Sequence, residues 1–541
     1  MVRRQKFAKH AMPRSRLLQR NNRSEFACET VLVGSLFFPF FDRGARVNFS
    51  GRKVYLVGIK GTGMASLAIM LKAFGAHVLG CDVTETFATD ELLLSSGISV
   101  HEGFSPSLLA LDADTVIHST AYTETLPILL EATRLGLVVY SYPQFLSYLS
   151  TLSDSYAVAG THGKTTTVAL ASYLLSTRTL STFPFYSLFG STVKGFSQPF
   201  YQGSESALFE ACEYQDHFLS YHLRGALVTN IELDHPDYFP SAREVHKSFE
   251  KFVDNLASGG FLICCSDDHG ARNLASYARR ERADLTVMTY GFDDNGPFRI
   301  IKKSYEDAYT LSCLDGCSFP LPVQERALVG NQIGSVVLAL SMILDRKNPK
   351  LYLESGTLIT AEIIPTLAGM LSKKLAGFPG VVGRCEIMRD EGGVLYVDDY
   401  AHHPTEIITT LGELHSSYPN RPILVIFAPH TASRTKTFLK DFVLSLCMAD
   451  RVIMQSCYGS ARNDNTGEGE QDMGEVLSHA LGERLMRTTR CRLQACVYAR
   501  NDEETVAIAS NWLQSQDLCI TMGAGNNRAL TERIAQARRS L

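Results

Sequence analysis

Short apolar runs, each ending in a glycine-rich or polar turn, recur along the chain and indicate its architecture. Before residue 150 these runs are Val54–Gly58, His77–Asp82, Thr115–Ser119 and Leu137–Tyr140. Runs of this length, bounded by turn residues, are typical of buried strands, and the segment after the first run predicts a helix through Phe74. Strands that alternate with helices predict a small α/β unit that ends near Ser150.

The same alternation appears twice more along the chain. The further expected strands are the run before Gly160, then Ala207–Ala211, Ala226–Asn230, Phe261–Cys265, Leu285–Tyr290, Val394–Asp398, Ile423–Phe427, Arg451–Met454, Ala495–Tyr498 and Leu518–Met522. The segment from Gly356 to Phe378 is expected to be a helix-rich linker. A chain of 541 residues is too long for one core. We therefore predict three α/β domains, at residues 51–150, 151–375 and 376–541, with the first and third Rossmann-like.

Residues 1–50 have a different composition from the rest of the chain. Eight Lys or Arg side chains precede the first acid, Glu25. The apolar run Val31–Phe41 is interrupted by Pro39 and is far too short to span a bilayer. A signal or transit peptide would also be basic at its start, but no small-residue cleavage site follows. We expect a basic extension that is disordered, or a start site placed too early.

Composition and charge narrow the possible partners. The formal net charge is −4, and hydrophobic residues make up 45% of the chain. This balance is typical of a soluble globular protein and gives no reason to expect nucleic acid or an anionic membrane as partner. The 13 cysteines include no Cys-x-x-Cys pair. Reduced thiols in a cytoplasmic protein explain them better than disulfides or zinc, and no obligate protein partner is evident.

The stretch Ser155–Thr167 joins an expected strand to an expected helix and resembles a phosphate-binding loop. Its two glycines allow a tight turn that presents backbone N–H groups to anionic oxygens, and the helix start adds the positive end of its dipole. The lysine supplies a charge for the outer phosphates, and the next threonine stands where a P-loop hydroxyl ligates Mg²⁺. Val158 replaces the usual first glycine, so the loop is a shortened variant. We predict a P-loop ATPase-like central domain whose nucleotide-binding residues are Gly160, Thr161, His162, Gly163, Lys164, Thr165 and Thr166.

The first strand opens into another glycine turn, Gly58–Met64. Its spacing is Gly-x-x-Gly-x-Gly and not the dinucleotide pattern Gly-x-Gly-x-x-Gly, so a nicotinamide cofactor and a dehydrogenase are weak interpretations. Asp82 ends the second strand, where a ligand for a ribose hydroxyl is expected in such folds. The same acid could equally cap a helix.

Acids and a histidine follow two strands of the central domain. Glu210 lies at the carboxyl end of one strand, with Glu213 close behind, and the segment Asn230–His235 follows the next. Open α/β sheets place ligand-contacting groups at these ends, and carboxylate oxygens suit Mg²⁺. For His235 taken alone, a solvated loop residue is an equally good interpretation.

The third domain carries polar side chains at its strand ends, which a purely structural domain would not require. The segment Asp399-Tyr-Ala-His-His-Pro-Thr-Glu406 follows one strand, and His430 and Arg434 follow the next. Adjacent side chains in extended backbone point to opposite sides, so we expect at most one of His402 and His403 to face a ligand.

Taken in this order, the motifs resemble those of the Mur ligase family over about residues 52–528. The resemblance rests on seven segments: Gly58–Met64, Gly160–Thr166, Glu210–Glu213, Thr229–Ile231 with Asp234 and His235, Asp398–Ile407, Pro429 and His430 with Ser433–Thr435, and Gly523–Gly525. It implies an ATP-dependent ligase that joins an amino acid to the carboxylate of UDP-N-acetylmuramate through an acyl phosphate, releasing ADP and phosphate. Its three domains would bind the UDP-sugar, ATP and the amino acid, and the first turn favours L-alanine as that amino acid.

The resemblance also implies roles for individual positions. Lys164 would hold the outer phosphates, Thr165 and Glu210 would ligate Mg²⁺, and His235 would ligate a second Mg²⁺. The implied catalytic residues are Lys164, Glu210, His235, His402 and Arg434, and the implied substrate-binding residues are Gly58, Gly61, Thr62, Gly63, Met64, Asp82, His402, His430 and Arg434.

Three positions depart from the family pattern. Cys212 and Asn526 stand where the family usually has Asp, and Gly330-Asn-Gln-Ile-Gly334 lacks the family's His and Asn on the adenine side. Two other functions stay open: a ligase that recycles murein tripeptide onto the same UDP-sugar, and a nucleotide-binding protein without catalysis.

Overall fold

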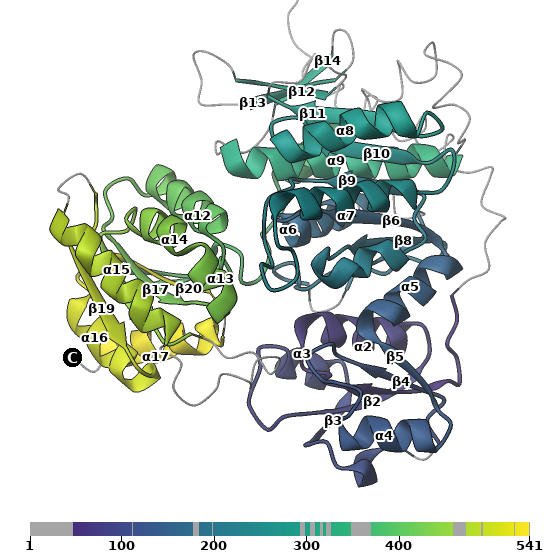
Figure 1. Ribbon diagram of the computed structural model, residues 1–541, viewed down its shortest axis with the longest axis horizontal. Coiled ribbons are helices and arrows are strands. Elements are labelled where there is room, and N and C mark those ends of the chain that lie inside the picture. Colours follow the sequence, from purple (N-terminus) through teal and green to yellow (C-terminus); the bar gives the residue numbers. More distant parts are fainter. Residues whose placement is uncertain are drawn as a thin grey trace, which may run out of the picture.

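The computed structural model describes residues 47–539, apart from 111, 177–182, 197–198, 293–297, 303–308, 314–316, 321–325, 348–368, 458–471, 488–490 and 524. Within these residues the chain forms three α/β domains, each built on one sheet (Figure 1). The amino-terminal and middle domains adjoin one another in this view, and the carboxy-terminal domain lies beside both. The predicted fold class is confirmed. Residues 1–46 of the predicted extension and residues 356–368 of the predicted linker lie outside the described residues.

The amino-terminal domain has a five-stranded parallel sheet in the order β3-β2-β1-β4-β5. All four strands expected in this domain are present, and the sequence analysis missed β3 because its side chains are only partly buried and it lacks an apolar run. The elements are β1 (Lys53–Val57), α2 (Thr62–Ala73), β2 (His77–Asp82), α3 (Asp90–Ser95), β3 (Ser99–Glu102), η1 (Pro106–Leu108), β4 (Thr115–His118), α4 (Pro127–Arg134), β5 (Val138–Ser141) and α5 (Tyr142–Leu152).

Residues 47–50 pack against this domain ahead of its first strand. Val47 is buried, and the Phe49 ring lies 6.1 Å from the ring of Phe74. The Phe49 N–H also donates a hydrogen bond to the Phe74 carbonyl at 3.0 Å. The packed chain therefore includes four residues ahead of the predicted domain boundary at residue 51.

We predict that a chain beginning at Arg46 folds and catalyses as the full chain does, because it keeps Val47 and Phe49. A chain beginning at Gly51 should melt at a lower temperature, since it loses the buried Val47 and the partly buried Phe49, and one fully buried side chain of this kind contributes about 1.5–3 kcal/mol. Thermal denaturation and ligation rates of the two truncated chains test this. An insoluble or inactive chain from Arg46, alongside an active full chain, would mean that the extension is part of the structure.

The middle domain has a nine-stranded sheet in the order β14-β13-β12-β11-β10-β9-β6-β8-β7. It is parallel from β7 to β12 and ends in antiparallel hairpins. The sequence analysis missed β7, although all four of its residues are buried, and it missed β12 to β14, in which polar residues interrupt the short apolar segments. The elements are β6 (Asp154–Ala159), α6 (Lys164–Leu175), β7 (Phe185–Leu188), β8 (Ser206–Glu210), η3 (Tyr214–Ser220), β9 (Gly225–Val228), α7 (Ala242–Asp254), β10 (Phe261–Cys265), α8 (His269–Glu281), β11 (Thr286–Gly291), β12 (Phe298–Lys302), β13 (Tyr309–Cys313), β14 (Cys317–Pro320) and α9 (Arg326–Lys347).

Helices α6 and α9 share one buried cluster, whereas α7 and α8 belong to another that also includes side chains of the amino-terminal domain. Helix α9 is apolar along most of its length. Among the described helices only its segment Leu328–Asp345 is long and apolar enough to cross a membrane, and 83% of that segment is buried inside the protein. We therefore assign α9 as a core helix of the middle domain.

The carboxy-terminal domain has a six-stranded sheet in the order β15-β16-β20-β17-β18-β19. Only the edge strand β15 is antiparallel, and the sequence analysis missed it because it is rich in charged residues. The elements are β15 (Glu386–Glu391), β16 (Val394–Asp399), α12 (Pro404–Ser417), β17 (Ile423–Ala428), α13 (Ala432–Thr437), α14 (Leu439–Leu446), β18 (Arg451–Gln455), α15 (Met473–Arg487), β19 (Ala495–Ala499), α16 (Asp502–Trp512), β20 (Leu518–Gly523) and α17 (Asn527–Arg539).

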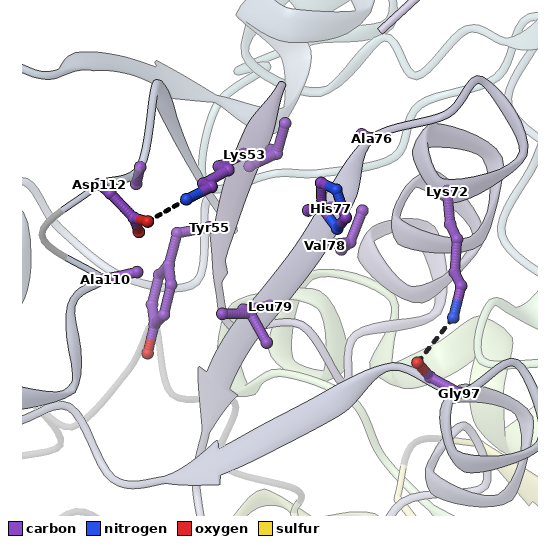
Figure 2. A pocket seen from close by; sticks show the side chains of 12 residues that line it. Lys53, Tyr55, Lys72, Ala76, His77, Val78, Leu79, Gly97, Ala110 and Asp112 are labelled. Atoms are coloured by element: carbon purple, nitrogen blue, oxygen red, sulfur yellow. Dashed lines mark hydrogen bonds and ion pairs between the residues drawn. The ribbon is translucent and has the colours of Figure 1, made fainter. Parts of the chain in front are cut away.

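A hollow of about 350 Å³ lies at the amino ends of strands β1 and β2 (Figure 2). Lys53 pairs there with Asp112, and Lys72 donates to the carbonyl of Gly97 at 2.7 Å. No predicted site residue lines this hollow, and open α/β sheets bind ligands at the opposite, carboxyl ends of their strands. This hollow is therefore not the candidate functional site.

Candidate active site

The phosphate loop connects β6 to α6 and requires glycine at two positions. Gly160 has φ of 130°, and a Cβ there would lie 2.1 Å from Thr229 Oγ1. Gly163 has φ of 79°, and its Cβ would lie 2.8 Å from the amide oxygen of Asn331. Both positive φ values disfavour side chains, so any substitution would strain or displace the loop.

Polar side chains after β9 hold the loop in place. The amide oxygen of Asn230 accepts the His162 N–H at 2.8 Å, and the Thr229 hydroxyl donates to the His162 carbonyl at 2.6 Å. Thr161 Oγ1 in turn accepts the N–H of Glu232 at 2.9 Å. In sheet order β6 lies between β8 and β9, so the loop sits between the strand ends that carry the predicted acids and histidine.

The Lys164 side chain is mostly buried and is held by three acceptors. Its Nζ donates to the carbonyls of Gly160 and Thr161 at 2.5 and 2.9 Å, and to Glu213 Oε2 at 2.9 Å. Burial alone lowers the pKa of Lys164, but the Glu213 carboxylate outweighs it and raises this pKa above its ordinary value. Lys164 is therefore a cation at neutral pH.

Glu210 and Thr165 meet beside the loop. The Thr165 hydroxyl donates to Glu210 Oε1 at 2.8 Å, and the Gly190 N–H donates to Glu210 Oε2 at 2.9 Å. Nearby, Glu213 Oε1 is buried with no hydrogen-bond partner. A hydroxyl and two carboxylates, one of which has an oxygen without a hydrogen bond, form a donor set that fits Mg²⁺.

The glycine turn of the amino-terminal domain, which leads into helix α2, lies close to Glu210. A Cβ on Gly190 would lie 3.6 Å from Glu210 Oε2 and 3.7 Å from Thr62 Oγ1, so Thr62 lies close to Glu210. Thr62 begins α2, and the positive end of a helix dipole favours anions. The predicted UDP-binding turn and the predicted magnesium ligands therefore adjoin each other.

The other residues of this turn are packed tightly. A Cβ on Gly63 would lie 2.9 Å from the Tyr142 hydroxyl, and one on Gly58 would lie 2.7 Å from the Tyr122 ring. The Gly61 carbonyl accepts a bond within the first turn of α2, and Met64 is buried beneath it. The structure brings Gly58, Gly61, Thr62, Gly63 and Met64 together.

Asp82 is buried and holds the same turn. Its Oδ2 accepts the Lys60 N–H at 2.6 Å, and its Oδ1 accepts the Tyr122 hydroxyl at 3.0 Å and the Val83 N–H at 2.8 Å. Through these bonds Asp82 stabilises the turn. Neither interpretation of Asp82 from the sequence, as a ribose ligand or as a helix cap, predicted this role. Its contact with a substrate stays a prediction.

Asp234 connects the middle domain to the carboxy-terminal domain. Its carboxylate accepts two bonds from Arg434, from Nε at 2.8 Å and from Nη2 at 3.2 Å, and both side chains are buried. Arg434 Nη1 lies 3.0 Å from His430 Nδ1. A buried pair with this geometry orients both residues, and losing one partner would leave an unpaired buried charge.

His235 follows Asp234 with φ of 52°, and its ring lies 4.5 Å from the ring of Tyr214. Burial lowers the pKa of His235, which keeps the imidazole neutral and able to ligate a metal at neutral pH. The left-handed backbone at His235 turns it away from an ordinary helical or extended path, and such strain is common at functional sites.

His402 and His403 point to different surroundings, as their alternation predicts. The His402 ring lies 5.4 Å from the His430 ring, whereas the His403 ring lies 4.6 Å from His162 of the phosphate loop. Burial lowers the pKa of both His402 and His403 to about 4. The backbone N–H groups of both donate to Glu406 Oε2.

His162 lies between two carboxylates. Its Nδ1 lies 3.2 Å from Glu406 Oε1, and its Nε2 lies 3.7 Å from Glu232 Oε2. Burial by itself lowers the pKa of His162, but these two carboxylates outweigh it and raise the pKa to about 9. The loop histidine is thus bound by acids from two domains.

A cavity of about 580 Å³ extends from the phosphate loop to the carboxy-terminal domain. It is lined by His162, Gly163 and Thr166 of the loop, by Asn331 and Gln332 of α9, and by Arg384, Asp399 and Glu406 across the interface, among others. Its position beside the loop suits the base and sugar of a nucleotide.

Four further residues bridge the two domains or line the cavity: Glu232, Asp234, Arg384 and Glu406. Glu232, Asp234 and Glu406 lie in segments singled out from the sequence but were given no individual role, and Arg384 was missed. Arg384 donates to the Thr165 hydroxyl at 3.5 Å. Only the i, i+3 spacing of His403 and Glu406, a capping box that begins α12, could have indicated a paired role beforehand.

The three departures from the family pattern have structural explanations of different strength. Asn331 lies against Gly163, so the altered segment does present an amide to the loop. The Asn526 side chain accepts the Ala529 N–H at 3.3 Å at the start of α17, a bond that Asp could also make. Burial raises the pKa of Cys212 to about 11, which leaves an unreactive thiol.

Asp398 gives the carboxy-terminal domain a dependence on pH. Burial and the neighbouring carboxylates of Asp399 and Glu386 raise the pKa of Asp398 to about 7, although Arg528 opposes them. Because the pKa of Asp398 is higher in the folded than in the unfolded protein, its contribution to folding stability is fully present below about pH 4 and is lost as the pH rises toward 7. At about pH 8 the Asp398→Asn variant should therefore be more stable than the wild type by up to ~4 kcal/mol, and it should melt at a higher temperature.

Thermal denaturation from about pH 4 to about pH 8 tests this, with exposed Asp390→Asn as the matched control. The gain for Asp398→Asn should shrink as pH falls toward 4. A gain that is independent of pH would contradict the assignment.

Three family models match successive parts of the chain. They are described as Mur ligase family, catalytic domain, at residues 53–153, Mur ligase middle domain at 158–331, and Mur ligase, glutamate ligase domain, at 383–525. A UDP-N-acetylmuramate–L-alanine ligase of Treponema pallidum is 36% identical over 488 residues, which cover 89% of this chain and 96% of that protein. A ligase of the same name from Borreliella burgdorferi is 33% identical over 485 residues, covering 88% and 96%.

Solved structures have the same fold. The UDP-N-acetylmuramate-alanine ligase MurC of Thermotoga maritima superposes with a TM-score of 0.68 at 20% identity, over 90% of this chain and 99% of that chain. A murein peptide ligase of Psychrobacter arcticus gives 0.66 at 20% identity, over 91% and 99%. Since the family models and the sequence relatives span most of the chain, including the phosphate loop and the residues that meet across the interface, the chain belongs to the Mur ligase family.

Proposed function

We propose that this protein is an ATP-dependent ligase that joins L-alanine to the carboxylate of UDP-N-acetylmuramate, a step in the synthesis of peptidoglycan precursors. The observation that carries the proposal is the meeting of three domains at one place. Thr62 at the start of α2 lies close to Glu210, which accepts the hydroxyl of Thr165 at the phosphate loop. Arg384 of the carboxy-terminal domain donates to the same hydroxyl. A ligase with three substrates needs such a meeting.

The reaction follows from the chemistry of a carboxylate. Its leaving group would be oxide, so the substrate carboxylate must first attack the γ-phosphorus of ATP, which forms an acyl phosphate and releases ADP. The amine of alanine then attacks the acyl carbon, loses a proton, and expels phosphate to form the amide. Both steps concentrate negative oxygens, which the site must neutralise.

Residues of the phosphate loop bind and orient the nucleotide. Lys164 exchanges Glu213 and the loop carbonyls for the outer phosphates, and the backbone N–H groups from Gly160 to Thr166 surround them. Arg384 and the cavity beside α9 orient the rest of ATP. Closure of the carboxy-terminal domain onto the loop excludes water that would hydrolyse the acyl phosphate.

Thr165, Glu210 and His235 would hold Mg²⁺, with Glu213 beside them. Bound Mg²⁺ supplies charge neutralisation on the β- and γ-phosphates, the usual contribution of such cations to phosphoryl transfer. Thr62 and the Gly58–Met64 turn bind the UDP diphosphate, and Asp82 holds that turn in shape. His402, His430 and Arg434 lie where the incoming amino acid would approach.

The relatives support L-alanine as the amine, since the two sequence relatives above are named as alanine ligases. The likeness to a murein peptide ligase rests on the fold, which both enzymes share. ATP and a nucleotide sugar are cytoplasmic metabolites, so we assign the protein to the cytoplasm, where the sequence analysis also placed it.

Release of ADP and phosphate by the purified full chain tests the proposal. Release should require both UDP-N-acetylmuramate and L-alanine, and the product should be the alanyl amide by mass spectrometry. Release with murein tripeptide in place of L-alanine would assign the recycling reaction. Nucleotide binding without any release would assign a non-catalytic protein.

A further inference from the structure

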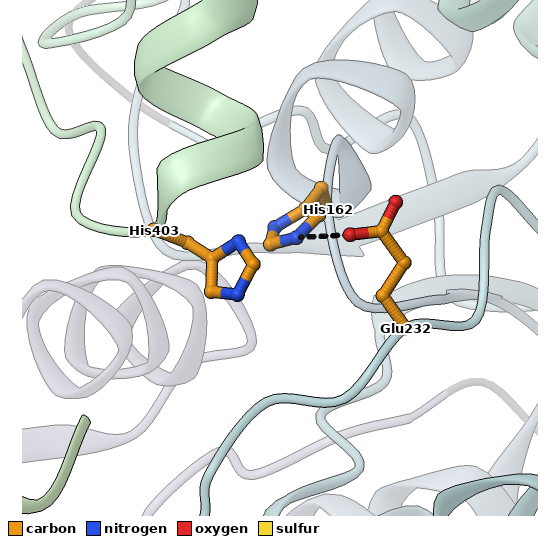
Figure 3. Close-up of side chains that lie close together, drawn as sticks. All are labelled: His162, Glu232 and His403. Atoms are coloured by element: carbon orange, nitrogen blue, oxygen red, sulfur yellow. Dashed lines mark ion pairs between the residues drawn. The ribbon is translucent and has the colours of Figure 1, made fainter. Parts of the chain in front are cut away.

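Three side chains that the proposed reaction leaves without a shared role lie together at the interface of the middle and carboxy-terminal domains. They are His162 of the phosphate loop, Glu232 after β9, and His403 at the start of α12 (Figure 3). One ligand atom of each lies within 4.8 Å of the others. The Nε2 of His162 and the Oε2 of Glu232 are 3.7 Å apart.

Both imidazoles keep a nitrogen that makes no hydrogen bond. His162 Nε2 and His403 Nε2 are buried and make no hydrogen bond. The Nδ1 of His403 accepts only a long bond of 3.3 Å from the Thr405 N–H. Buried polar atoms nearly always make hydrogen bonds, so two imidazole nitrogens that make none beside one carboxylate require an explanation.

The surrounding residues orient these groups as outer-shell residues orient metal ligands. Glu406 Oε1 lies 3.2 Å from His162 Nδ1, which directs Nε2 toward Glu232. A bound ion would take the place of the Nε2 proton. The Thr405 hydroxyl donates to Glu232 Oε2 at 2.8 Å and restrains the carboxylate. A histidine that bonds a carboxylate through one nitrogen and faces an open position with the other is the usual arrangement around protein-bound zinc.

We propose that His162, Glu232 and His403 form a binding site for a divalent transition-metal ion of the zinc type, which links the middle and carboxy-terminal domains beside the phosphate loop. Two imidazoles and one carboxylate are a ligand set that suits zinc, whereas Mg²⁺ prefers oxygen ligands. A tetrahedral site with bonds of about 2.1 Å has ligand atoms about 3.4 Å apart, close to the 3.7 Å between His162 and Glu232. The His403 ring must move closer to complete it.

This site shares no residue with the proposed Mg²⁺ ligands Thr165, Glu210 and His235. Two of its ligands belong to the middle domain and one to the carboxy-terminal domain, so a bound ion holds the closed arrangement. Three protein ligands leave a fourth position for water or a phosphate oxygen. Because its ligands come from both domains, occupation of the site should slow the separation of the middle and carboxy-terminal domains.

Cobalt(II) is the probe for the test, since tetrahedral Co²⁺ absorbs visible light and thiolate ligands add a separate charge-transfer band. The full chain is titrated with Co²⁺ in excess Mg²⁺ and the absence of nucleotide, and then with Zn²⁺. We expect one Co²⁺ per chain with a tetrahedral spectrum, no thiolate band, and displacement by Zn²⁺. Zn²⁺ should also raise the melting temperature.

His403→Gln and Glu232→Gln should each weaken Co²⁺ binding at least ~10-fold, because each removes one of three ligands. Exposed His479→Gln is the matched control and should bind as the wild type does. Melting curves in the absence of metal show whether each variant is folded, and the Glu232 variant keeps the test available if the His403 variant is not. A thiolate band, no binding near one equivalent, or unchanged binding in either folded variant would overturn the proposal.

Discussion

Replacing Lys164 with alanine should lower the ligation rate by a factor of ~10²–10³, as the loss of one charge stabiliser of a transition state typically does. Lys164 is buried and cationic, and its Nζ donates to a carbonyl of the phosphate loop, which holds the charge at the loop. The charge interacts more strongly with the transferring phosphoryl group than with ATP at rest. The rate of ADP release at saturating substrates measures the effect.

The variant also leaves the buried carboxylate of Glu213 without its partner, which costs stability independently of catalysis. The double variant Lys164→Ala with Glu213→Gln removes that penalty and should melt at a higher temperature than Lys164→Ala. Lys247→Ala, on the exposed face of α7, is the matched control and should keep the normal rate. A folded Lys164→Ala protein with a near-normal rate would exclude the phosphate-loop assignment.

Glu210→Ala and His235→Ala should each strongly reduce formation of the acyl phosphate and raise the Mg²⁺ requirement, and the double variant should be little worse than either. Glu210 ends β8 and His235 follows β9, and these strands lie on either side of the phosphate-loop strand β6. They would hold cations that stabilise the same developing charge. Groups that act as a unit show losses that do not add.

A double-mutant cycle on the ligation rate at several Mg²⁺ concentrations measures this coupling. Calorimetry of UDP-N-acetylmuramate binding is the control, because its diphosphate is assigned to the Gly58–Met64 turn in another domain. Binding of the UDP-sugar should survive in all three variants. Strictly additive losses with an unchanged Mg²⁺ dependence would mean that Glu210 and His235 do not share one metal-dependent step.

The local pattern of the sequence predicted the strands that build the centre of each sheet. Runs such as Phe261–Cys265 and Ile423–Phe427 are continuous and apolar because both faces of a parallel sheet are covered. Strands β3 and β15 could not be predicted this way. Each lies at a sheet edge, is partly solvent-exposed, and tolerates charged residues such as Glu102 and Arg389.

The phosphate loop was also evident from the sequence, since its two glycines satisfy a local backbone requirement. Gly160 and Gly163 have positive φ, a conformation that other residues adopt rarely. The lysine and threonine follow at fixed positions because a helix starts directly after the turn. The conformation of this loop could therefore be predicted from the spacing of its residues alone.

Contacts between the domains were decided only by the tertiary structure. Asp234 meets Arg434 across 200 residues of chain, and His162 meets Glu406 across 244. Asp82 stabilises the Gly58–Met64 turn of its own domain, although its position in the sequence suggested a contact with the substrate. A pairing of this kind depends on how two separately folded surfaces dock, and the local spacing of residues contains no information on that docking. The sequence by itself thus determined which residues could carry the chemistry, and the docking of the domains determined which of them meet.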